Sequence, residues 1–418
     1  MTALAEPPPD KSYRPKVLVL SKSYPNSVFE VLGLWVENLV RHSAEFCEPK
    51  VIAPVQYCPP IPGLPEYYRR FRSIPGHCFA SGIEVIHPRM LVGPGYSLHS
   101  IESRIYYWAV CRVAKRLRRD FPFDLIHAHF TYPDGVAAVR LGKQFGIPVV
   151  ITEQNPWGPW MDEDTAVRRQ SIRAAQECTF HIAISRSVRE SIVRLTGESN
   201  KLRIVPDAVD GDTFTLPEWG NGPIHNQIIF VGAIRPVKGV DILLRSVRLL
   251  VDAGRDVKLL LVGESFFRSY KKESDRLRQM AVDLGIAGRV NFAGKKPLTE
   301  LVREIQKSAV LVLPSRAESF GMVLVEALAC GTPVVATRCG GPEDIVTEEV
   351  GVLVPPENPQ ALAAGIARVL DRRGDYDPAK LRAHALERFG LESVGQRLQA
   401  LYAEALSTRS GSSKSLKS

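Results

Sequence analysis

Short apolar runs rich in Val, Ile and Leu alternate with helical patterns along most of the chain. A continuous run such as KVLVL (16–20) is typical of a strand buried on both faces of a parallel sheet, because helices cover both faces there. Similar runs follow at KVIAP (50–54), DLIHAHF (124–130), IPVVITE (147–153), HIAIS (181–185) and KLRIVPD (201–207). The stretch at 56–82, rich in Pro, Tyr and Arg, is predicted to be irregular. The pattern predicts an α/β domain with a mostly parallel sheet.

A second series of the same kind occupies the other half of the chain. Its expected strands are QIIFVGA (227–233), KLLLVGE (258–264), RVNFAG (289–294), AVLVLP (309–314), TPVVAT (332–337) and GVLVP (351–355). Helical patterns lie between them, which predicts a second doubly wound sheet. The expected fold class is therefore α/β, with two Rossmann-like domains facing a cleft. Ligands bind such sheets beyond the carboxyl ends of the strands, so the chemistry is expected there.

The segment DAVDGDTFTLPEWGNGPIHN (207–226) interrupts this alternation and is rich in turn-forming residues, so we interpret it as a linker. A helix at about 386–408 is expected to pack back on the first domain. The expected organisation is a disordered lead (1–14), a first domain (15–206), the linker, a second domain (227–385) and a disordered tail (409–418).

Composition narrows the class of protein. The chain has 418 residues, 45% of them hydrophobic and 24% charged, as in a globular protein of two domains. No stretch approaches the roughly 18 apolar residues of a membrane span, and the polar N-terminus does not resemble a signal peptide. Seven cysteines without a CxxC pair predict reduced thiols in a cytoplasmic protein and no structural metal.

The formal charge of +9 is concentrated in the first half of the chain, where residues 1–205 hold 26 Lys and Arg against 19 Asp and Glu. Two basic segments, YYRRFR (67–72) and CRVAKRLRRD (111–120), contain interleaved aromatic or aliphatic residues. Such segments attract anionic lipid headgroups by about 1 kcal/mol per basic residue. An anionic membrane surface is one candidate partner, an anionic polysaccharide is another, and a solvated helix face is the alternative. No nucleic-acid-binding motif is found.

Two glutamates occupy the stretch PSRAESFGMVLVEALACGTPV (314–334). Glu318 lies in the loop before a helix that begins near Gly321, and Glu326 lies about one and a half turns inside the helix, on its buried side. The free N–H groups of Phe320, Gly321 and Met322 would form an anion site at the start of the helix. A buried carboxylate needs hydrogen-bond donors, which the vicinal hydroxyls of a ligand can supply. This layout suits a nucleotide sugar; the alternative is one capping and one surface glutamate.

A second loop favours the same kind of ligand. In FVGAIRPVKGVDILL (230–244), Arg235 and Lys238 lie in the turn between a strand and a helix, with Gly232 and Gly239 beside them. The motif is not a P-loop, because GxxxxGK[ST] is absent. Paired cations in such a turn can bind a diphosphate and stabilise its charge as it departs. The alternative is a solvated basic loop.

Taken together, VGAIRPVKG and ESFGMVLVEALACGTPVVAT resemble the retaining glycosyltransferases of family 4, which have the GT-B architecture. The resemblance is most specific over 228–370 and extends to DLIHAHFTYPDG and AISRSV in the first half. It implies a metal-independent hexosyltransferase that moves a sugar, with retention of configuration, to a glycan, lipid-linked or polysaccharide acceptor. The donor would be a UDP-, GDP- or ADP-sugar, with no bound cofactor. Biosynthesis of a polysaccharide or glycolipid at the inner face of the membrane is the expected setting.

The resemblance also implies residue roles. Glu318 would bind hydroxyls of the donor sugar, and Glu326 would bind those of the ribose. Lys238 and Arg235, with the amides of Phe320, Gly321 and Met322, would bind the diphosphate. Three glycines complete the implied donor-binding set: Gly33 beside the diphosphate or acceptor, Gly232 at the strand end, and Gly294 beside the base.

Two positions depart from the family pattern. The family usually has Arg directly after the glycine of the VG strand end, where this chain has Ala233 and places Arg235 two residues later. Members often carry His in a Thr-x-His sequence, where TEQN places Gln154. Glutamine can donate a hydrogen bond but cannot act as a base. Gln154 is therefore assigned to the catalytic and acceptor side, and His129 is the next candidate there; a His at the end of a buried strand that is simply hydrogen-bonded is the alternative.

Two other functions remain as alternatives. Ala233 and Gln154 are compatible with a non-catalytic protein that binds a nucleotide sugar or acts as a scaffold. A UDP-sugar epimerase of the same fold would need further acid and base groups, of which the sequence gives no obvious set. The combination of Glu318, Glu326 and Lys238 favours a transferase, because a scaffold has no use for all three.

Overall fold

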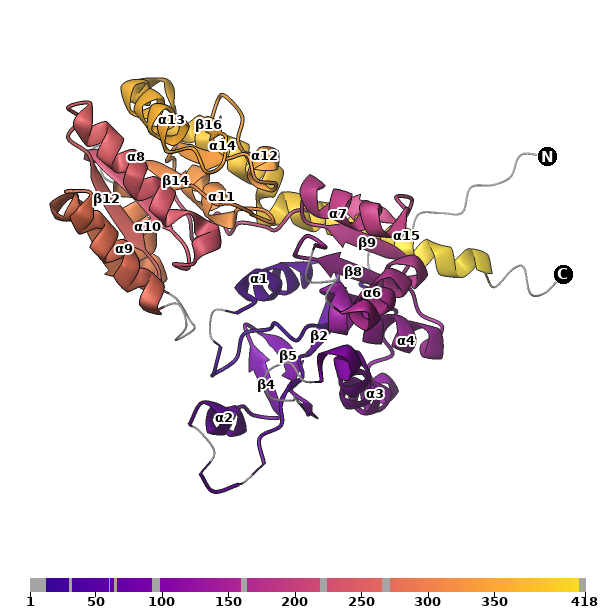
Figure 1. Ribbon diagram of the computed structural model, residues 1–418. Coiled ribbons are helices and arrows are strands. Elements are labelled where there is room, and N and C mark those ends of the chain that lie inside the picture. The colour runs from indigo at the N-terminus through magenta and orange to yellow at the C-terminus, as the bar shows by residue number, and fades with distance from the viewer. Residues whose placement is uncertain are drawn as a thin grey trace, which may run out of the picture. The chain divides into compact units, whose positions relative to one another are not determined.

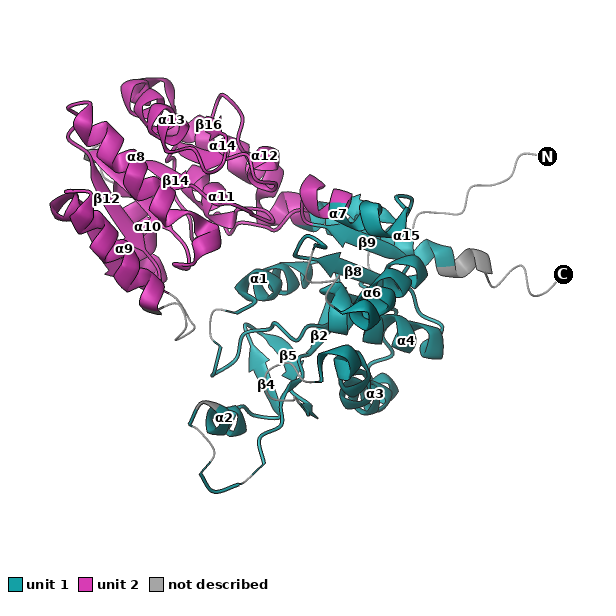
Figure 2. Ribbon diagram, in the orientation of Figure 1, with its two compact units in different colours: residues 1–183, 191–203, 395–418 teal, residues 184–190, 204–394 magenta. Residues whose placement is uncertain are grey.

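The structure is a computed structural model that describes residues 13–29, 32–59, 61–63, 66–91, 98–158, 164–218, 224–264 and 271–412. The chain divides into two compact units, and Figure 2 shows them in different colours. Unit 1 consists of residues 1–183, 191–203 and 395–418, and unit 2 consists of residues 184–190 and 204–394. Each unit contains its own mainly parallel sheet, which confirms the predicted α/β fold class.

Unit 1 is built on an eight-stranded sheet with the order β10-β9-β8-β7-β1-β2-β5-β4. Its strands are β1 (Lys16–Leu20), β2 (Glu48–Ile52), β4 (His77–Ala80), β5 (Ile83–Ile86), β7 (Leu125–His129), β8 (Val149–Glu153), β9 (Phe180–Ala183) and β10 (Leu202–Ile204). The edge strand β4 is antiparallel to β5, whereas β1 is parallel to both of its neighbours. The short strands β3 (Val55–Gln56) and β6 (Arg89–Met90) form a separate two-stranded sheet.

The helices of unit 1 flank this sheet, except α2, which lies apart from it (Figure 1). They are α1 (Leu34–Ser43), α2 (Glu66–Arg70), α3 (Glu102–Asp120), α4 (Val136–Phe145), α6 (Thr165–Glu177) and α7 (Arg186–Thr196), of which α7 crosses into unit 2. Residues of α3 and α4, such as Tyr106 and Leu141, pack with Leu18, Leu20 and Ile126 of the sheet in one core. The sequence predicted the central strands well because they are continuously apolar. It missed the order within 56–82, where α2 and β4 lie, because these short elements have little apolar pattern.

Unit 2 contains a six-stranded sheet with the order β13-β12-β11-β14-β15-β16. The strands are β11 (Ile224–Val231), β12 (Lys258–Val262), β13 (Val290–Gly294), β14 (Ser308–Leu313), β15 (Val334–Thr337) and β16 (Gly351–Val354). All are parallel to their neighbours, so their carboxyl ends lie at one edge of the sheet. The helices are α8 (Val240–Asp252), α9 (Lys271–Asp283), α10 (Leu298–Lys307), α11 (Met322–Ala329), α12 (Pro342–Ile345), α13 (Pro359–Asp371) and α14 (Pro378–Phe389).

The segment interpreted as a linker is held on unit 2 by hydrogen bonds in its first half. Arg382 of α14 donates to the carbonyl oxygens of Gly211 (2.8 Å) and Phe214 (2.5 Å). Gln306 donates to the carbonyl oxygen of Thr215 at 2.7 Å. The longer segment of unit 2, residues 204–394, accordingly includes the residues interpreted as a linker. Composition marked the turns in this segment but could not show what they pack against.

The last helix, α15 (Leu391–Ser412), belongs to unit 1 from residue 395 onward. The hydroxyl of Tyr402 and Nδ1 of His127 lie 2.7 Å apart in the interior, and Nε2 of His127 lies 2.8 Å from the Thr152 hydroxyl. Burial and the neighbouring His129 hold the pKa of His127 well below its usual value, so the ring is neutral. A buried polar contact therefore joins α15 to strands β7 and β8.

The terminal predictions lie largely outside the described residues, since 1–12 and 413–418 are not described. Within the part that is described, Arg14 donates to the carbonyl oxygen of Cys47 at 2.9 Å, and α15 remains helical through Ser412. The expected disordered lead and tail stay predictions.

Replacing Tyr402 by Phe tests the contact that holds α15. The exchange leaves a buried nitrogen of His127 unpaired, so we expect the free energy of unfolding of unit 1 to fall by about 1–3 kcal/mol. Native-state hydrogen exchange of amides in β7 and α15 measures this. Tyr57→Phe, at a side chain that is 43% exposed, is the matched control and should change the value by less than about 0.5 kcal/mol. Equal effects of the two exchanges would contradict a structural role for this contact.

Candidate active site

Two loops at the carboxyl ends of β11 and β14 lie side by side in unit 2. Gly239 has φ 65°, and a Cβ atom there would lie 2.0 Å from the carbonyl oxygen of Pro314, so only glycine fits. The Arg316 amide donates to the Val237 carbonyl oxygen at 2.8 Å. These two backbone contacts hold the loop that carries Lys238 against the loop that carries Glu318.

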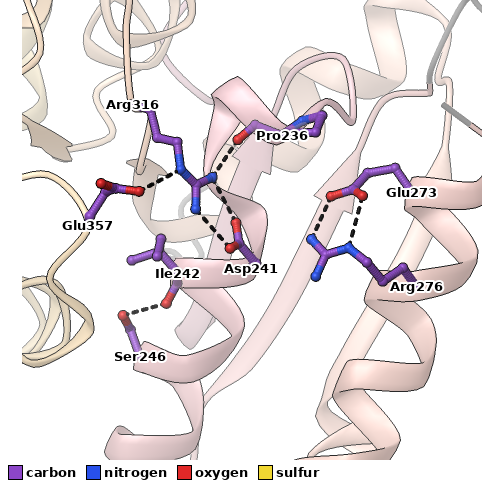
Figure 3. A network of polar contacts seen from close by, with 8 residues as sticks. All are labelled: Pro236, Asp241, Ile242, Ser246, Glu273, Arg276, Arg316 and Glu357. Carbon is purple, nitrogen blue, oxygen red and sulfur yellow. Dashed lines mark hydrogen bonds and ion pairs between the residues drawn. The ribbon is translucent and has the colours of Figure 1, made fainter.

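The side chain of Arg316 strengthens the same junction (Figure 3). Its guanidinium donates to both carboxylate oxygens of Asp241, at 3.0 and 2.9 Å, and to the carbonyl oxygen of Pro236 at 2.5 Å. It also donates to Glu357 at 2.9 Å. Burial would raise the pKa of Asp241, but the contacts with Arg316 outweigh burial and lower it. The sequence analysis missed Arg316, which positions both loops, because no local pattern pairs it with Asp241.

The junction brings Lys238 and Glu318 together. Nζ of Lys238 lies 2.5 Å from Oε2 of Glu318, and the Ser315 hydroxyl donates to the same oxygen at 3.3 Å. The side chains are 24% and 13% exposed, so both groups can be reached from solvent. The resemblance assigns Lys238 to the diphosphate and Glu318 to the sugar, and the structure brings the two groups within hydrogen-bonding distance. A ligand at this position would therefore contact the cation and the carboxylate together.

The start of α11 presents backbone amides next to this pair. Gly321 precedes the helix with φ 106°, a conformation that favours glycine. Within the described chain, the amides of Phe320, Gly321 and Met322 donate no hydrogen bond, as expected at a helix N-terminus. The Phe320 ring is buried against Phe389 with 5.5 Å between centroids, so this residue offers only its backbone.

The loop that follows β15 also holds the backbone of Glu318. The Glu318 amide donates to the Cys339 carbonyl oxygen at 3.2 Å, and the Gly341 amide donates to the Glu318 carbonyl oxygen at 2.9 Å. A Cβ atom on Gly341 would lie 2.2 Å from Cα of Phe320. The sequence analysis did not assign Gly340 and Gly341, although two adjacent glycines after a strand were a signal for close backbone approach.

Glu326 is a carboxylate without a partner. Part of its surface is accessible, yet protein atoms surround it closely enough that burial raises its pKa to about 7. Among the described residues, the Glu326 carboxylate has no hydrogen-bond or ion-pair partner. Its capacity to accept hydrogen bonds is therefore available to a ligand, as its assignment to ribose hydroxyls would require.

Glycines at the ends of the neighbouring strands approach one another closely. The Gly263 amide donates to the Gly294 carbonyl oxygen at 2.9 Å, and a Cβ atom on Gly263 would lie 2.0 Å from the Gly232 carbonyl oxygen. The exposed Glu264 follows, and its Oε1 would lie 2.9 Å from a Cβ atom on Gly294. The ends of β11, β12 and β13 thus present backbone, with Glu264 as a carboxylate that the sequence analysis did not single out. Arg235 is exposed in extended backbone just beyond β11.

In unit 1, Gly33 caps α1 with φ 80°, and a Cβ atom there would lie 1.7 Å from the carbonyl oxygen of Ser23. The conformation and the close approach both require glycine. A residue with a side chain could not occupy position 33 without moving Ser23. The loop between β1 and α1 therefore depends on Gly33, whatever ligand it contacts.

His129 is fully buried at the end of β7, and neither of its ring nitrogens has a hydrogen-bond partner in the described structure. Burial lowers its pKa to about 3, so the ring is neutral and has no exposed surface for contact with an acceptor. Gln154 is 6% exposed directly after β8, and no hydrogen bond of its side chain is found in the described structure. Both acceptor-side assignments stay predictions.

Glu153 organises this part of unit 1 and was missed from the sequence. Its buried carboxylate accepts hydrogen bonds from the amides of Gln154 and Asn155, at 3.0 and 3.1 Å. It also accepts from the Thr131 amide at 3.1 Å and from the Trp157 indole at 3.0 Å. Four N–H donors satisfy the charge and fix the loops after β7 and β8. A Glu at the end of an apolar strand was the available signal.

Comparison with known proteins now adds to this geometry. A family model described as "Glycosyltransferase Family 4" matches residues 33–213, and one described as "Glycosyl transferases group 1" matches residues 218–387. A D-inositol 3-phosphate glycosyltransferase of Corynebacterium efficiens is 35% identical over 318 residues, which cover 69% of this chain and 73% of the relative. The enzyme of that name from Acidothermus cellulolyticus is 30% identical, with coverage of 71% and 70%.

The chain belongs to glycosyltransferase family 4.

Solved structures agree on the fold of this glycosyltransferase. Sucrose-phosphate synthase from Thermosynechococcus elongatus superimposes with a TM-score of 0.76 at 20% identity and covers 94% of this chain and all of the other. HepE from Anabaena, in complex with UDP-glucose, gives a TM-score of 0.69 at 19% identity, with coverage of 94% and 100%. The GT-B fold predicted from the sequence is confirmed. Among the described residues, no helix is long and apolar enough to span a membrane.

The raised pKa of Glu326 predicts a pH dependence of the stability of the glycosyltransferase. The folded protein binds a proton that the unfolded chain releases near the ordinary value of 4.5, so this contribution is full below pH 4.5 and is lost as the pH rises through about 7. We expect Glu326→Gln to remove it, a difference of roughly 1–3 kcal/mol between pH 5 and pH 8. Urea unfolding at each pH measures it, with the exposed Glu348→Gln as control. Parallel curves for wild type and Glu326→Gln would contradict the raised pKa.

Proposed function

We propose that this glycosyltransferase transfers a hexose from a nucleotide-diphosphate donor to a glycan, lipid-linked or polysaccharide acceptor, with retention of configuration. The observation that carries the proposal is the arrangement around α11. A lysine and a glutamate in contact lie beside the free amides of a helix start, and the same helix carries Glu326, a closely surrounded carboxylate with no partner among the described residues. A diphosphate with a hydroxyl-bearing group at each end matches this arrangement: the lysine and the amides suit the phosphates, and the two carboxylates suit the hydroxyls. The complex of HepE with UDP-glucose supports a donor of this class.

The proposed chemistry breaks the bond between the anomeric carbon and the diphosphate and forms a bond from that carbon to the acceptor oxygen on the same face. The bonding electrons pass to the leaving diphosphate, whose oxygen receives the acceptor proton. Lys238, Arg235 and the helix-start amides stabilise the charge that develops on the phosphate. No carboxylate nucleophile and no metal are needed in this scheme, since protein cations supply the positive charge. Glu318 orients the donor sugar, and Gln154 donates a hydrogen bond on the acceptor side.

Glu326 is assigned to the ribose of the donor. An ionised carboxylate accepts hydrogen bonds from both vicinal hydroxyls, which replaces the water lost on burial. Its pKa of about 7 means that this form becomes dominant only above neutral pH in the free protein. Binding of the donor would favour the ionised form by supplying two donors. The nucleotide base would lie at the glycine-rich ends of β12 and β13, beside Gly294.

Lys238→Ala and Glu318→Ala should each reduce kcat by about 100-fold or more, because each removes a group that acts on the charge or orientation of the reacting donor. Release of UDP, GDP or ADP from a donor panel, with an acceptor panel that includes inositol 3-phosphate and lipid-linked glycans, measures the rate. Lys380→Ala and Glu348→Ala remove exposed side chains of the same types and serve as matched controls. An unchanged rate in either site variant would remove that residue from the mechanism.

The same panel separates the alternative functions. Binding of a nucleotide in a thermal-shift assay without turnover in any acceptor mixture would favour the scaffold protein suggested by Ala233 and Gln154. Conversion of a UDP-sugar to its epimer, without transfer, would favour the epimerase. Analysis of the anomeric configuration of the product by NMR tests retention, and an inverted product would contradict the proposed displacement.

A further inference from the structure

Helix α3 presents two very different faces. Its inward side packs into the core of unit 1 through Tyr106, Val110, Cys111 and Ala114, all buried. The exposed residues are Ile101 directly before the helix and, within it, Arg104, Trp108, Arg112, Lys115, Arg116, Arg119 and Asp120. We call the set from Ile101 to Arg119, five cations with one indole and one isoleucine, the outer face of α3. At about 100° per residue, all seven positions fall within roughly one third of the helix circumference.

The described part of the chain does not neutralise the charge of the outer face. None of its five cations has an ion pair or hydrogen bond within the described structure. Glu102, the one acidic residue in the first turn, is buried and forms an ion pair with Lys22. Asp120 is the only acid on the exposed side and lies at the last position of the helix. Arg140 of the neighbouring α4 adds another exposed cation, which lies over the Tyr107 ring at 5.7 Å.

Trp108 lies in the middle of these charges with 74% of its surface exposed, more than any other large hydrophobic side chain in the described structure. Its one ring contact is with Tyr107, edge to face, at 6.0 Å between centroids. Exposure of an indole to water costs free energy that burial elsewhere would recover. An indole prefers an environment that is apolar at one end and hydrated at the other, which the headgroup region of a bilayer provides.

We propose that the outer face of α3 binds an anionic lipid surface. The five cations attract the headgroups, and the indole of Trp108 inserts at the level of the acyl–headgroup boundary. The two apolar residues are too few for deep insertion, so binding is shallow, reversible and dependent on salt. The indole favours a lipid interface, where it is apolar at one end and hydrated at the other, and binding of a polyanion instead is one outcome of the test. The proposal goes beyond the transfer reaction and does not depend on it.

Flotation of the full-length protein with vesicles tests this proposal without any assay of transfer. We expect the protein to float at low salt with vesicles of 30% phosphatidylglycerol in phosphatidylcholine, and to remain at the bottom with pure phosphatidylcholine. Replacement of Arg112, Lys115, Arg116 and Arg119 by Gln should lower the partition by at least about tenfold. Trp108→Ser should lower it several-fold while it leaves the net charge unchanged.

The matched control is a variant that loses the same number of positive charges from unit 2 as the α3 variant loses from unit 1. Replacement of Arg245, Arg303, Arg368 and Lys380 by Gln removes three exposed arginines and one exposed lysine, as the α3 variant does. This control should float as the wild type does. Absence of flotation by the wild type at low salt, or equal partition of the two quadruple variants, would overturn the proposal. Retention on heparin without vesicle binding would also overturn it, in favour of a polyanion.

The tryptophan provides a second, spectroscopic test. Because Trp108 is exposed in the free protein, its emission should shift to the blue on binding of anionic vesicles, and lipids with brominated acyl chains should quench it. The difference between wild type and Trp108→Phe isolates this signal from the other four tryptophans. If the protein binds the vesicles and the emission of Trp108 does not change, the outer face of α3 does not contact the lipid. That result would overturn the proposal.

Discussion

The close approach of two backbone loops in unit 2 is the constraint on which the site depends. Gly239 lies against the Pro314 carbonyl group where no side chain would fit, and Arg316 joins its own loop to Pro236 and Asp241. Parallel strands bring these loops to one edge of the sheet, but only the missing side chain lets them touch. Lys238 therefore meets Glu318, eighty positions away in the sequence. The chemistry proposed for this protein follows from that contact.

Burial divides the two glutamates of the site into different roles. Glu318 is paired with a lysine and remains reachable, so it is already hydrogen-bonded before any ligand arrives. Glu326 has no side-chain hydrogen-bond or ion-pair partner among the described residues, and burial raises its pKa to about 7. One carboxylate is thus held by a lysine, whereas the other offers unused hydrogen-bond acceptors at a cost in stability. Such a cost is typical of residues kept for binding, because folding alone would favour an apolar residue there.

At the strand ends of unit 1, Glu153 and His127 differ from Glu326, because their buried polar atoms are hydrogen-bonded. Glu153 is fully buried but satisfied by four N–H donors, and His127 is hydrogen-bonded on both ring nitrogens. These contacts tie loops and the C-terminal helix to the sheet, although the neighbouring His129 has no hydrogen-bond partner on either ring nitrogen in the described structure. The unsatisfied charge of this unit lies outside, on α3, where solvent or an anionic surface can compensate it. Unit 1 therefore combines a rigid polar interior with a basic exterior.

The sequence by itself determined the α/β class, the central strands and the family, because continuous apolar runs and closely spaced glycines are local signals. It also located Lys238, Glu318 and Glu326. Only the tertiary structure decided that Lys238 contacts Glu318, that Arg316 positions both loops and that Glu153 anchors unit 1. Those facts depend on residues distant in the chain that meet where parallel strands end. The same reason applies to α3, whose basic run was visible in the sequence. Only packing of Tyr106 and Val110 inward showed which side of the helix carries Trp108 and its cations outward.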